Sequence, residues 1–168
     1  MLIDAIRLLL FPALMAFAAS SDLITMTISN KISLALAAGF LILGAAAGMG
    51  AGEIGIHVAA GFAALAVAFG LFACGWIGGG DAKLAAATAL WLGFDQLLSY
   101  LFLASLLGGA LTLLVIQFRL VPLPGVLHGS KWAERLHEKD AGVPYGIALA
   151  AAALVVYPET VWMKAVAG

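Results

Sequence analysis

The sequence predicts an all-α, polytopic membrane protein of about six transmembrane helices, forming one domain over residues 1–168. Hydrophobic residues make up 64% of the chain and charged residues only 10%, and the mean hydropathy is +1.12. Soluble domains carry about 25% charged residues, so this chain lacks the polar surface of a soluble protein. The second observation is a series of long apolar runs. A helix needs about 20 apolar residues to cross a bilayer, so these runs indicate transmembrane helices.

The apolar runs and the polar breaks between them predict the helices in order. They cover about 2–20, 32–49, 54–76, 81–94, 96–118 and 143–156. Pro12 lies in the first helix, where its ring removes a backbone hydrogen bond and can kink the chain. The fourth helix has about 14 residues, or about 21 Å, against a hydrocarbon core of about 30 Å. Its start at Asp81 is therefore expected below the membrane surface.

Three glycines, Gly78, Gly79 and Gly80, come directly before Asp81. Irregular backbone at membrane depth is tolerated only inside protein or beside a water-filled cavity. The glycine loop therefore predicts a wet pocket at the start of the fourth helix. Residues without Cβ would also let an extended substrate backbone approach the carboxylate closely.

Asp22 and Asp81 are the candidate catalytic residues. An ionisable residue in a membrane segment is a functional-site hypothesis by default, and Asp22 follows the first apolar run. Aspartyl proteolysis needs two carboxyl groups that share one proton: one activates a water and the other polarises the scissile carbonyl. The alternative interpretation of each acid is a helix cap at the membrane boundary.

The positions of the basic residues predict the orientation, because positive charge accumulates in cytoplasmic loops. An extracytoplasmic N-terminus puts only Arg7 and Lys164 outside and puts six basic residues in the cytoplasm: Lys31, Lys83, Arg119, Lys131, Arg135 and Lys139. Asp22 and Asp81 then share the cytoplasmic side, and both termini are extracytoplasmic.

The longest loop, residues 119–142, holds most of the remaining polar residues. Within it, residues 130–139 predict a short helix with Trp132 and Leu136 on one face. Basic residues around an aromatic anchor are typical of a helix on the membrane surface. The loop is either a solvated connection or a surface that receives a substrate from the cytoplasm.

Several motifs resemble those of a known family. The string from Gly78 to Leu84 resembles the Gly-x-Gly-Asp-x-Lys-Leu motif of type IV prepilin peptidases, which are intramembrane aspartyl proteases. Asp22 followed by Ile28-Ser29-Asn30 is similar to their first-aspartate motif, with Ser29 in place of the usual proline. Val143-Pro144-Tyr145-Gly146 resembles the small peptidases that serve tight-adherence (Flp) pili.

This resemblance implies cleavage of a short basic leader from prepilins or pseudopilins at the cytoplasmic face of the bacterial inner membrane. It implies Asp22 and Asp81 as the catalytic pair and the three glycines as the catalytic-loop backbone. Larger members also methylate the new N-terminus and carry an N-terminal domain with paired cysteines. This chain begins at its first helix and contains one cysteine, so methyltransferase activity is doubtful.

The possible supporting residues are Lys83, Asn30, Pro144 and Tyr145. Lys83 lies two positions from Asp81 and is expected on another helix face, where it reaches the interface; the alternative is that it orients an acidic substrate group or tunes the pair. Asn30 is expected to cap the second helix.

No cofactor or metal is expected, because neither the single cysteine nor the histidines have the spacing of a metal site. The expected partners are the prepilin leader peptide and membrane lipid, with no nucleic acid; a homo-oligomer stays open. Two other functions also stay open. One is a proton-coupled transporter that uses the aspartates, and the other is a non-enzymatic membrane protein of pilus assembly.

Overall fold

The computed structural model describes residues 2–167, so Met1 and Gly168 of the predicted domain lie outside the described part. Residues 2–167 form helices joined by short loops, with no strand among them, which confirms the all-α prediction. The α-helices are α1 (Leu2–Thr25), α2 (Asn30–Ala46), α3 (Ala51–Ala73), α4 (Gly79–Leu120), α5 (Lys131–His137), α6 (Tyr145–Val156) and α7 (Val161–Ala167). Two short 3-10 helices cover Gly125–Leu127 and Tyr157–Glu159.

Three of the described helices are long and apolar enough to cross a membrane. They are α3, α4 and the part of α1 from Ala5 to Thr25, while α2 and the segment Tyr145–Glu159 are shorter apolar helices. Large apolar side chains cover the outside of the bundle; Leu98, for example, is 78% exposed and Phe102 is 73% exposed. Such an apolar exterior is unfavourable in water and favourable in lipid. The chain is a polytopic membrane protein.

Helix α4 is interrupted at Gly93, whose backbone angles are φ 64° and ψ −178°. One cavity is lined by both Asp81 and Gly108, which a continuous helix would hold about 40 Å apart. The chain therefore reverses at Gly93, and the two halves of α4 border the same cavity. The first half confirms the predicted short fourth helix, and the reversal comes two residues before the predicted break.

The first helix is longer than predicted. It continues to Thr25, whereas the sequence suggested an end at Ser20. The polar residues do not stop the helix because Ser20 Oγ donates to the Ala16 carbonyl (2.8 Å) and Thr25 Oγ1 to the Ser21 carbonyl (2.7 Å). Hydroxyl groups that bond back to the preceding turn are compatible with a helix. Asp22 thus lies in the last turns of α1 rather than after the helix.

An aromatic core joins α1, α2, α4 and the C-terminal segment. Trp91 packs against Trp162, with ring centroids 4.9 Å apart, and Phe11 stacks on Tyr157 at 4.4 Å. The Trp91 indole donates to the Leu36 carbonyl (2.9 Å), and the Trp162 indole donates to the Trp91 carbonyl (2.8 Å). Trp91 lies about 15 Å along the helix from Asp81. This core holds the helices together at a distance from the two acids.

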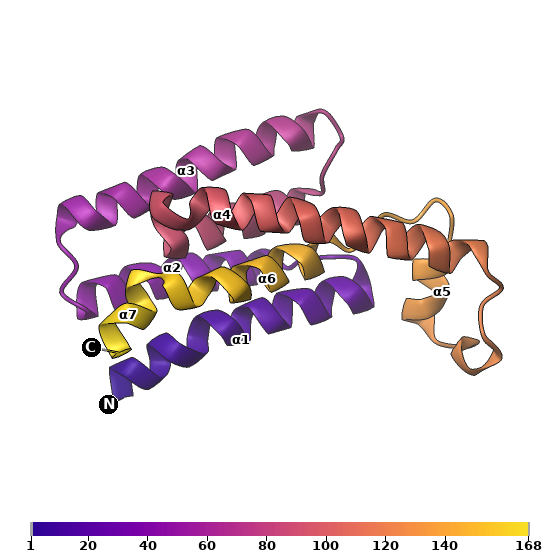
Figure 1. The fold of residues 1–168 in the computed structure, drawn as a ribbon, viewed down its shortest axis with the longest axis horizontal. Coiled ribbons are helices and arrows are strands. Elements are labelled where there is room, and N and C mark those ends of the chain that lie inside the picture. The colour runs from indigo at the N-terminus through magenta and orange to yellow at the C-terminus, as the bar shows by residue number, and fades with distance from the viewer. Residues whose placement is uncertain (1, 168) are drawn as a thin grey trace.

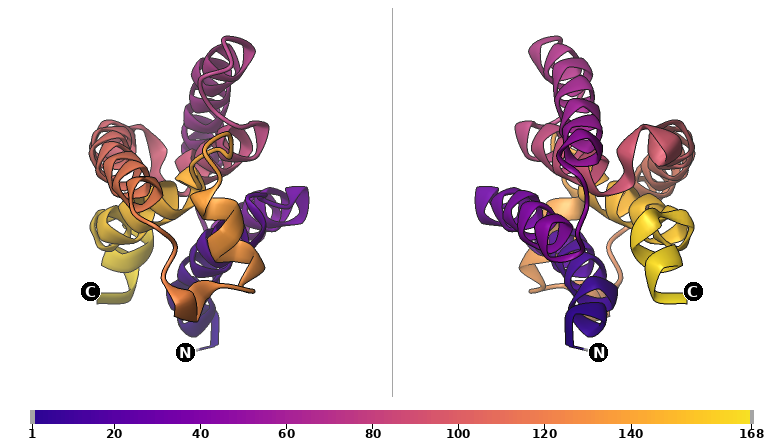
Figure 2. Two further views of the ribbon diagram at one scale, coloured as in Figure 1. Left: turned by 90° about the vertical axis from the view of Figure 1, so that its right-hand side faces the viewer. Right: turned by 90° about the vertical axis from the view of Figure 1, so that its left-hand side faces the viewer.

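The two ends of the bundle differ. The chain termini lie together at one end, and α5 with its flanking loops lies at the other (Figures 1 and 2). Helix α1 ends and α2 begins at the α5 end, and α3 ends and α4 begins there as well. Asp22 and Asp81 therefore belong to the end that also carries the 119–142 loop.

Candidate active site

Asp22 is buried, with 5% of its surface exposed. Its Oδ2 accepts a hydrogen bond of 2.7 Å from the backbone N–H of Gly146, the second residue of α6. A Cβ at Gly146 would lie 2.8 Å from this oxygen and 2.7 Å from Ile28 Cδ1. Glycine therefore lets the start of α6 approach Asp22 closely. The first backbone N–H groups of a helix have no partner within that helix, so they are favourable partners for a carboxylate.

Asp81 lies in the first turn of α4 and is partly exposed. Its Oδ2 accepts a hydrogen bond of 3.2 Å from the Gly78 N–H, which is a capping contact within its own helix. The capping interpretation thus describes one contact of Asp81. Asp22 lies near the C-terminal end of its own helix, and the amide that it accepts from belongs to the first turn of α6, so it caps another helix.

The fold brings the two predicted acids to the same end of the bundle, on either side of Ile28 (Figure 1). Ile28 lies between them, because its Cβ is 3.2 Å from the Cβ position of Gly80 while its Cδ1 adjoins Gly146. The hydrogen bonds described for the two carboxyl groups go to separate backbone amides. The two acids thus lie at one end of the bundle (Figure 1), and no hydrogen bond is described between them.

A cavity of about 460 Å³ adjoins Asp81 and lies between α3, the two halves of α4, and α6. Its lining is mainly apolar, with polar groups from Asp81, Tyr145 and Ser105. The Tyr145 hydroxyl is 3.0 Å from Thr112 Oγ1, so it links α6 to the second half of α4. Of the supporting candidates, Tyr145 therefore lies on the cavity wall with Asp81. Pro144 is fully buried directly before it and precedes α6.

The other two supporting candidates, Lys83 and Asn30, pair with each other. Lys83 Nζ donates to Asn30 Oδ1 at 2.9 Å, and both line a different cavity from Asp81. The prediction that Asn30 caps the second helix is wrong. Ser29 is the N-cap, and its hydroxyl accepts from the Lys31 N–H at 3.3 Å. Asn30 is already the first helical residue, and its side chain is directed to Lys83.

The 119–142 loop contains α5 within the predicted range. Arg119 donates to the carbonyls of Leu136 and Gly142, each at 2.8 Å. Arg135 donates to the Ile24 carbonyl (2.9 Å), two residues after Asp22. Two of the basic residues that predicted the orientation thus also fix the loop: Arg119 holds it to the end of α4, and Arg135 holds α5 to the end of α1.

Sequence reasoning missed the contributions of Gly146, Ile28 and Arg135. The signal for Gly146 was a glycine directly after Pro144-Tyr145 at the start of an apolar run. Nothing in the sequence pairs Gly146 with Asp22, 124 residues away. Within residues 2–167 no three His, Cys, Asp or Glu side chains form a group suited to a metal. The carboxyl groups of Asp22 and Asp81 can take up and release protons, which suits acid and base chemistry.

Comparison with known proteins identifies the family. A family model described as the type IV leader peptidase family matches residues 9–113, more than half of the chain. The chain belongs to the type IV leader peptidase family. The matched part of this leader peptidase contains Asp22, the glycine loop and Asp81, and it ends before Tyr145 and Gly146. Neither the curated proteins nor the solved structures contain a match.

Proposed function

We propose that this leader peptidase is an intramembrane aspartyl endopeptidase with Asp22 and Asp81 as its catalytic pair. Its substrates are Flp/Tad-type prepilins or pseudopilins, and it cuts at the cytoplasmic face of the inner membrane. The observation that carries the proposal is the placement of two acids, 59 residues apart in the sequence, at the same end of the bundle on either side of Ile28, in a chain with few charges. Family membership favours this peptidase function over the transporter and assembly-protein alternatives.

The chemistry follows from one shared proton. The ionised carboxyl group takes a proton from a water molecule while the oxygen of that water attacks the scissile carbonyl. The protonated carboxyl group donates its proton to the carbonyl oxygen. The tetrahedral intermediate then collapses and the C–N bond breaks: the protonated carboxyl group gives its proton to the leaving amine, and a hydroxyl of the intermediate gives its proton to the ionised one, so the pair again holds one proton. Catalytic contacts are often long in a resting enzyme and tighten with substrate. Separate amide partners for Asp22 and Asp81 are compatible with this mechanism.

The backbone amides of Gly78 and Gly146 each donate to Oδ2 of one acid. In the proposed mechanism, Oδ1 of each carboxyl group is the oxygen that acts on water or substrate. The glycine loop, Gly78 to Gly80, supplies a backbone surface against which an extended peptide can lie. We assign these residues a positioning role.

The cavity beside Asp81 supports a substrate with an apolar segment next to the cleaved bond, because its walls are mainly apolar and one of its polar groups is Asp81. The Flp/Tad branch is supported by the Val143–Gly146 string, whose glycine contacts Asp22. In this arrangement residues 1–168 form one six-helix peptidase domain, with the 119–142 loop in the cytoplasm and both termini outside it.

The test is cleavage of a co-expressed Flp-type prepilin by single aspartate variants. We expect Asp22→Asn and Asp81→Asn each to abolish the appearance of mature pilin while the protein still accumulates in the membrane. Asp95→Asn is the matched control: Asp95 is an exposed aspartate near the reversal at Gly93, far along α4 from Asp81. It should leave cleavage unchanged.

Mature pilin formed at the normal rate by either Asp22→Asn or Asp81→Asn would overturn the catalytic assignment. Sequencing the new N-terminus of the product reports the cleavage site and any methylation in the same experiment. If an Flp-type prepilin stays uncut while another class of prepilin is processed, the Flp/Tad assignment is wrong.

A further inference from the structure

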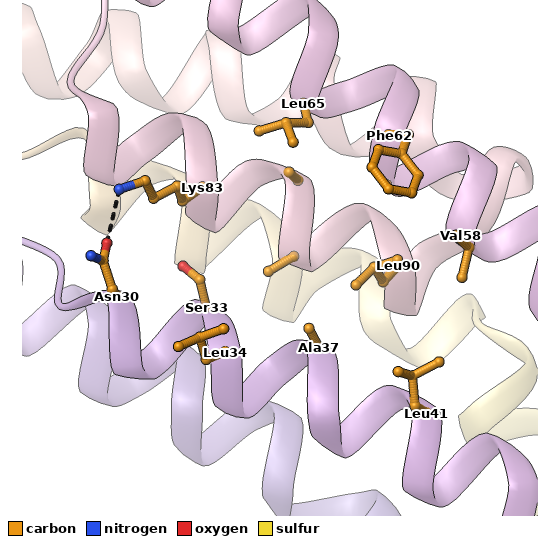
Figure 3. A pocket seen from close by; sticks show the side chains of 13 residues that line it. Asn30, Ser33, Leu34, Ala37, Leu41, Val58, Phe62, Leu65, Lys83 and Leu90 are labelled. Carbon is orange, nitrogen blue, oxygen red and sulfur yellow. Dashed lines mark hydrogen bonds between the residues drawn. The ribbon is translucent and has the colours of Figure 1, made fainter.

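A second cavity, of about 530 Å³, lies between α2, α3 and the first half of α4. Apolar side chains form most of its lining, among them Leu34, Leu41 and Phe62, while Asn30, Ser33 and Lys83 are polar (Figure 3). Residues 81 and 83 project about 200° apart around a helix. Lys83 therefore lines this cavity while Asp81 lines the other, with the α4 backbone between them.

The shape of this cavity follows from the packing of its walls. Helices α2 and α3 are connected by a short turn, yet they make few contacts with each other because both pack on α4. Small residues, among them Ala37, Gly61 and Ala86, line the space that remains. The result is a lateral apolar groove between helices, at the depth where a membrane protein meets hydrocarbon chains.

The polar end of the groove carries the positive charge of Lys83, for which no ion pair is found among residues 2–167. Lys83 donates to the Asn30 side chain, which is a neutral amide and does not neutralise the ammonium group. Two further N–H donors of Lys83 remain for another acceptor. The Ser33 hydroxyl is buried without a hydrogen-bond partner among the described residues. Lys31, in the same first turn of α2, adds positive charge. An anionic group rich in oxygen acceptors fits this end.

The length of the groove matches one lipid chain. From Asn30 to Leu41 it follows α2 for about 16 Å, close to half of a hydrocarbon core of about 30 Å. An acyl chain that starts at Lys83 would therefore end near the middle of the bilayer. Lysine side chains at such positions reach toward headgroup phosphates, and basic pockets between transmembrane helices bind anionic lipids.

We propose that this groove binds one anionic phospholipid, with an acyl chain between α2 and α3 and its phosphate on Lys83. The lipid comes from the leaflet on the side of Asp22 and Asp81. A prepilin segment in the same groove could not present its peptide bond to Asp81, because the first half of α4 lies between them. The proposal concerns binding and does not depend on the catalytic assignment.

The test is native mass spectrometry of the purified full chain in detergent, titrated with phosphatidylglycerol or with phosphatidylcholine that has the same acyl chains. We expect one phosphatidylglycerol bound per chain, and phosphatidylcholine should bind at least about fivefold more weakly. This ratio is the affinity that one lysine adds for an anionic headgroup. Lys83→Gln should remove this preference, and Lys83→Arg should retain it. Equal binding of the two lipids to the unchanged protein would overturn the proposal.

Matched controls separate the groove from general surface effects. Lys131→Gln removes one positive charge at the same end of the bundle but outside the groove, and it should leave binding unchanged. Ala37→Phe fills the groove and should abolish lipid binding, whereas Ala38→Phe adds the same volume at an exposed neighbouring position of α2. A Lys131→Gln effect equal to that of Lys83→Gln would overturn the proposal, as would full binding by the Ala37→Phe variant.

Two other occupants give different results in the same experiment. If a second copy fills the groove, Ala37→Phe converts a dimer to a monomer without changing lipid binding. If a prepilin segment fills it, added prepilin displaces phosphatidylglycerol. Either outcome contradicts the lipid assignment. Elution of each variant as a single sharp peak in size-exclusion chromatography shows that it is folded.

Discussion

Gly146 leaves no room for a side chain beside Asp22. An added Cβ would lie 2.8 Å from the carboxylate oxygen and 2.7 Å from Ile28, so Gly146→Ala must displace Asp22, Ile28 or the start of α6. Because a displacement of about 1 Å near reacting groups can reduce rates about 100-fold, we expect prepilin cleavage to fall by about 10- to 100-fold. The measurement is kcat/KM in detergent. Gly142→Ala is the control, since no atom lies within 4 Å of its Cβ position.

At the same scale, the proposed pair predicts a bell-shaped pH dependence. Below the optimum both carboxyl groups are protonated and no base remains to activate water; above it both are ionised and no acid remains for the carbonyl. The kcat/KM of the purified enzyme should therefore fall on both sides. A profile that stays flat through the range where carboxyl groups titrate would argue against a shared proton.

At the scale of secondary-structure elements, Gly93 controls the reversal of α4. Its φ of 64° and ψ of −178° belong to a region that only glycine occupies readily. A Cβ there would also lie 2.9 Å from the His57 ring, whose Nδ1 is 2.7 Å from the Leu90 carbonyl. Two separate constraints therefore keep this position as glycine.

We expect Gly93→Ala to destabilise the protein by about 1–3 kcal/mol. Thermal unfolding in detergent measures the effect. Gly70→Ala is the matched control in the interior of α3, where no atom lies within 4 Å of the Cβ position. Alanine should be neutral there or stabilising by up to about 1 kcal/mol. Equal stability of the Gly93→Ala and Gly70→Ala variants would show that the reversal does not depend on Gly93.

At the scale of the whole molecule, six of the eight lysine and arginine residues share one end of the bundle with Asp22 and Asp81 (Figure 1). Cys74, the only cysteine, caps the C-terminal end of α3 at this end and is exposed. The proposed orientation predicts that a membrane-impermeant thiol reagent labels Cys74 in inverted membrane vesicles and not in intact cells. The physical reason is the accumulation of lysine and arginine in cytoplasmic loops.

The reciprocal experiment uses the opposite end of the bundle. Gly50, between α2 and α3, is exposed and has no atom within 4 Å of its Cβ position. In a Cys74→Ser background, Gly50→Cys should be labelled from outside the cell once the outer membrane is permeabilised. Labelling with the reverse sidedness at both positions would invert the proposed topology and put the acids outside the cytoplasm.

The sequence by itself determined the helical membrane class and the short helix that follows the glycine loop. These features depend on local composition and on the period of apolar residues, which act over one turn or one helix. It also singled out Asp22 and Asp81, because an acid in an apolar segment is conspicuous without any knowledge of its neighbours. It erred at the end of α1 and at Asn30, where side-chain hydrogen bonds decide the local structure.

Only the tertiary structure decided which groups contact the acids. The amide of Gly146 reaches Asp22 across 124 residues, and the reversal at Gly93 folds Gly108 back to the cavity of Asp81. The spacing of two residues already put Lys83 on another helix face than Asp81, but only the fold shows that this face borders a second cavity between α2 and α3. Contacts of this kind depend on how helices pack, and spacing along the chain does not encode them. The acids could be found from sequence, whereas their surroundings required the fold.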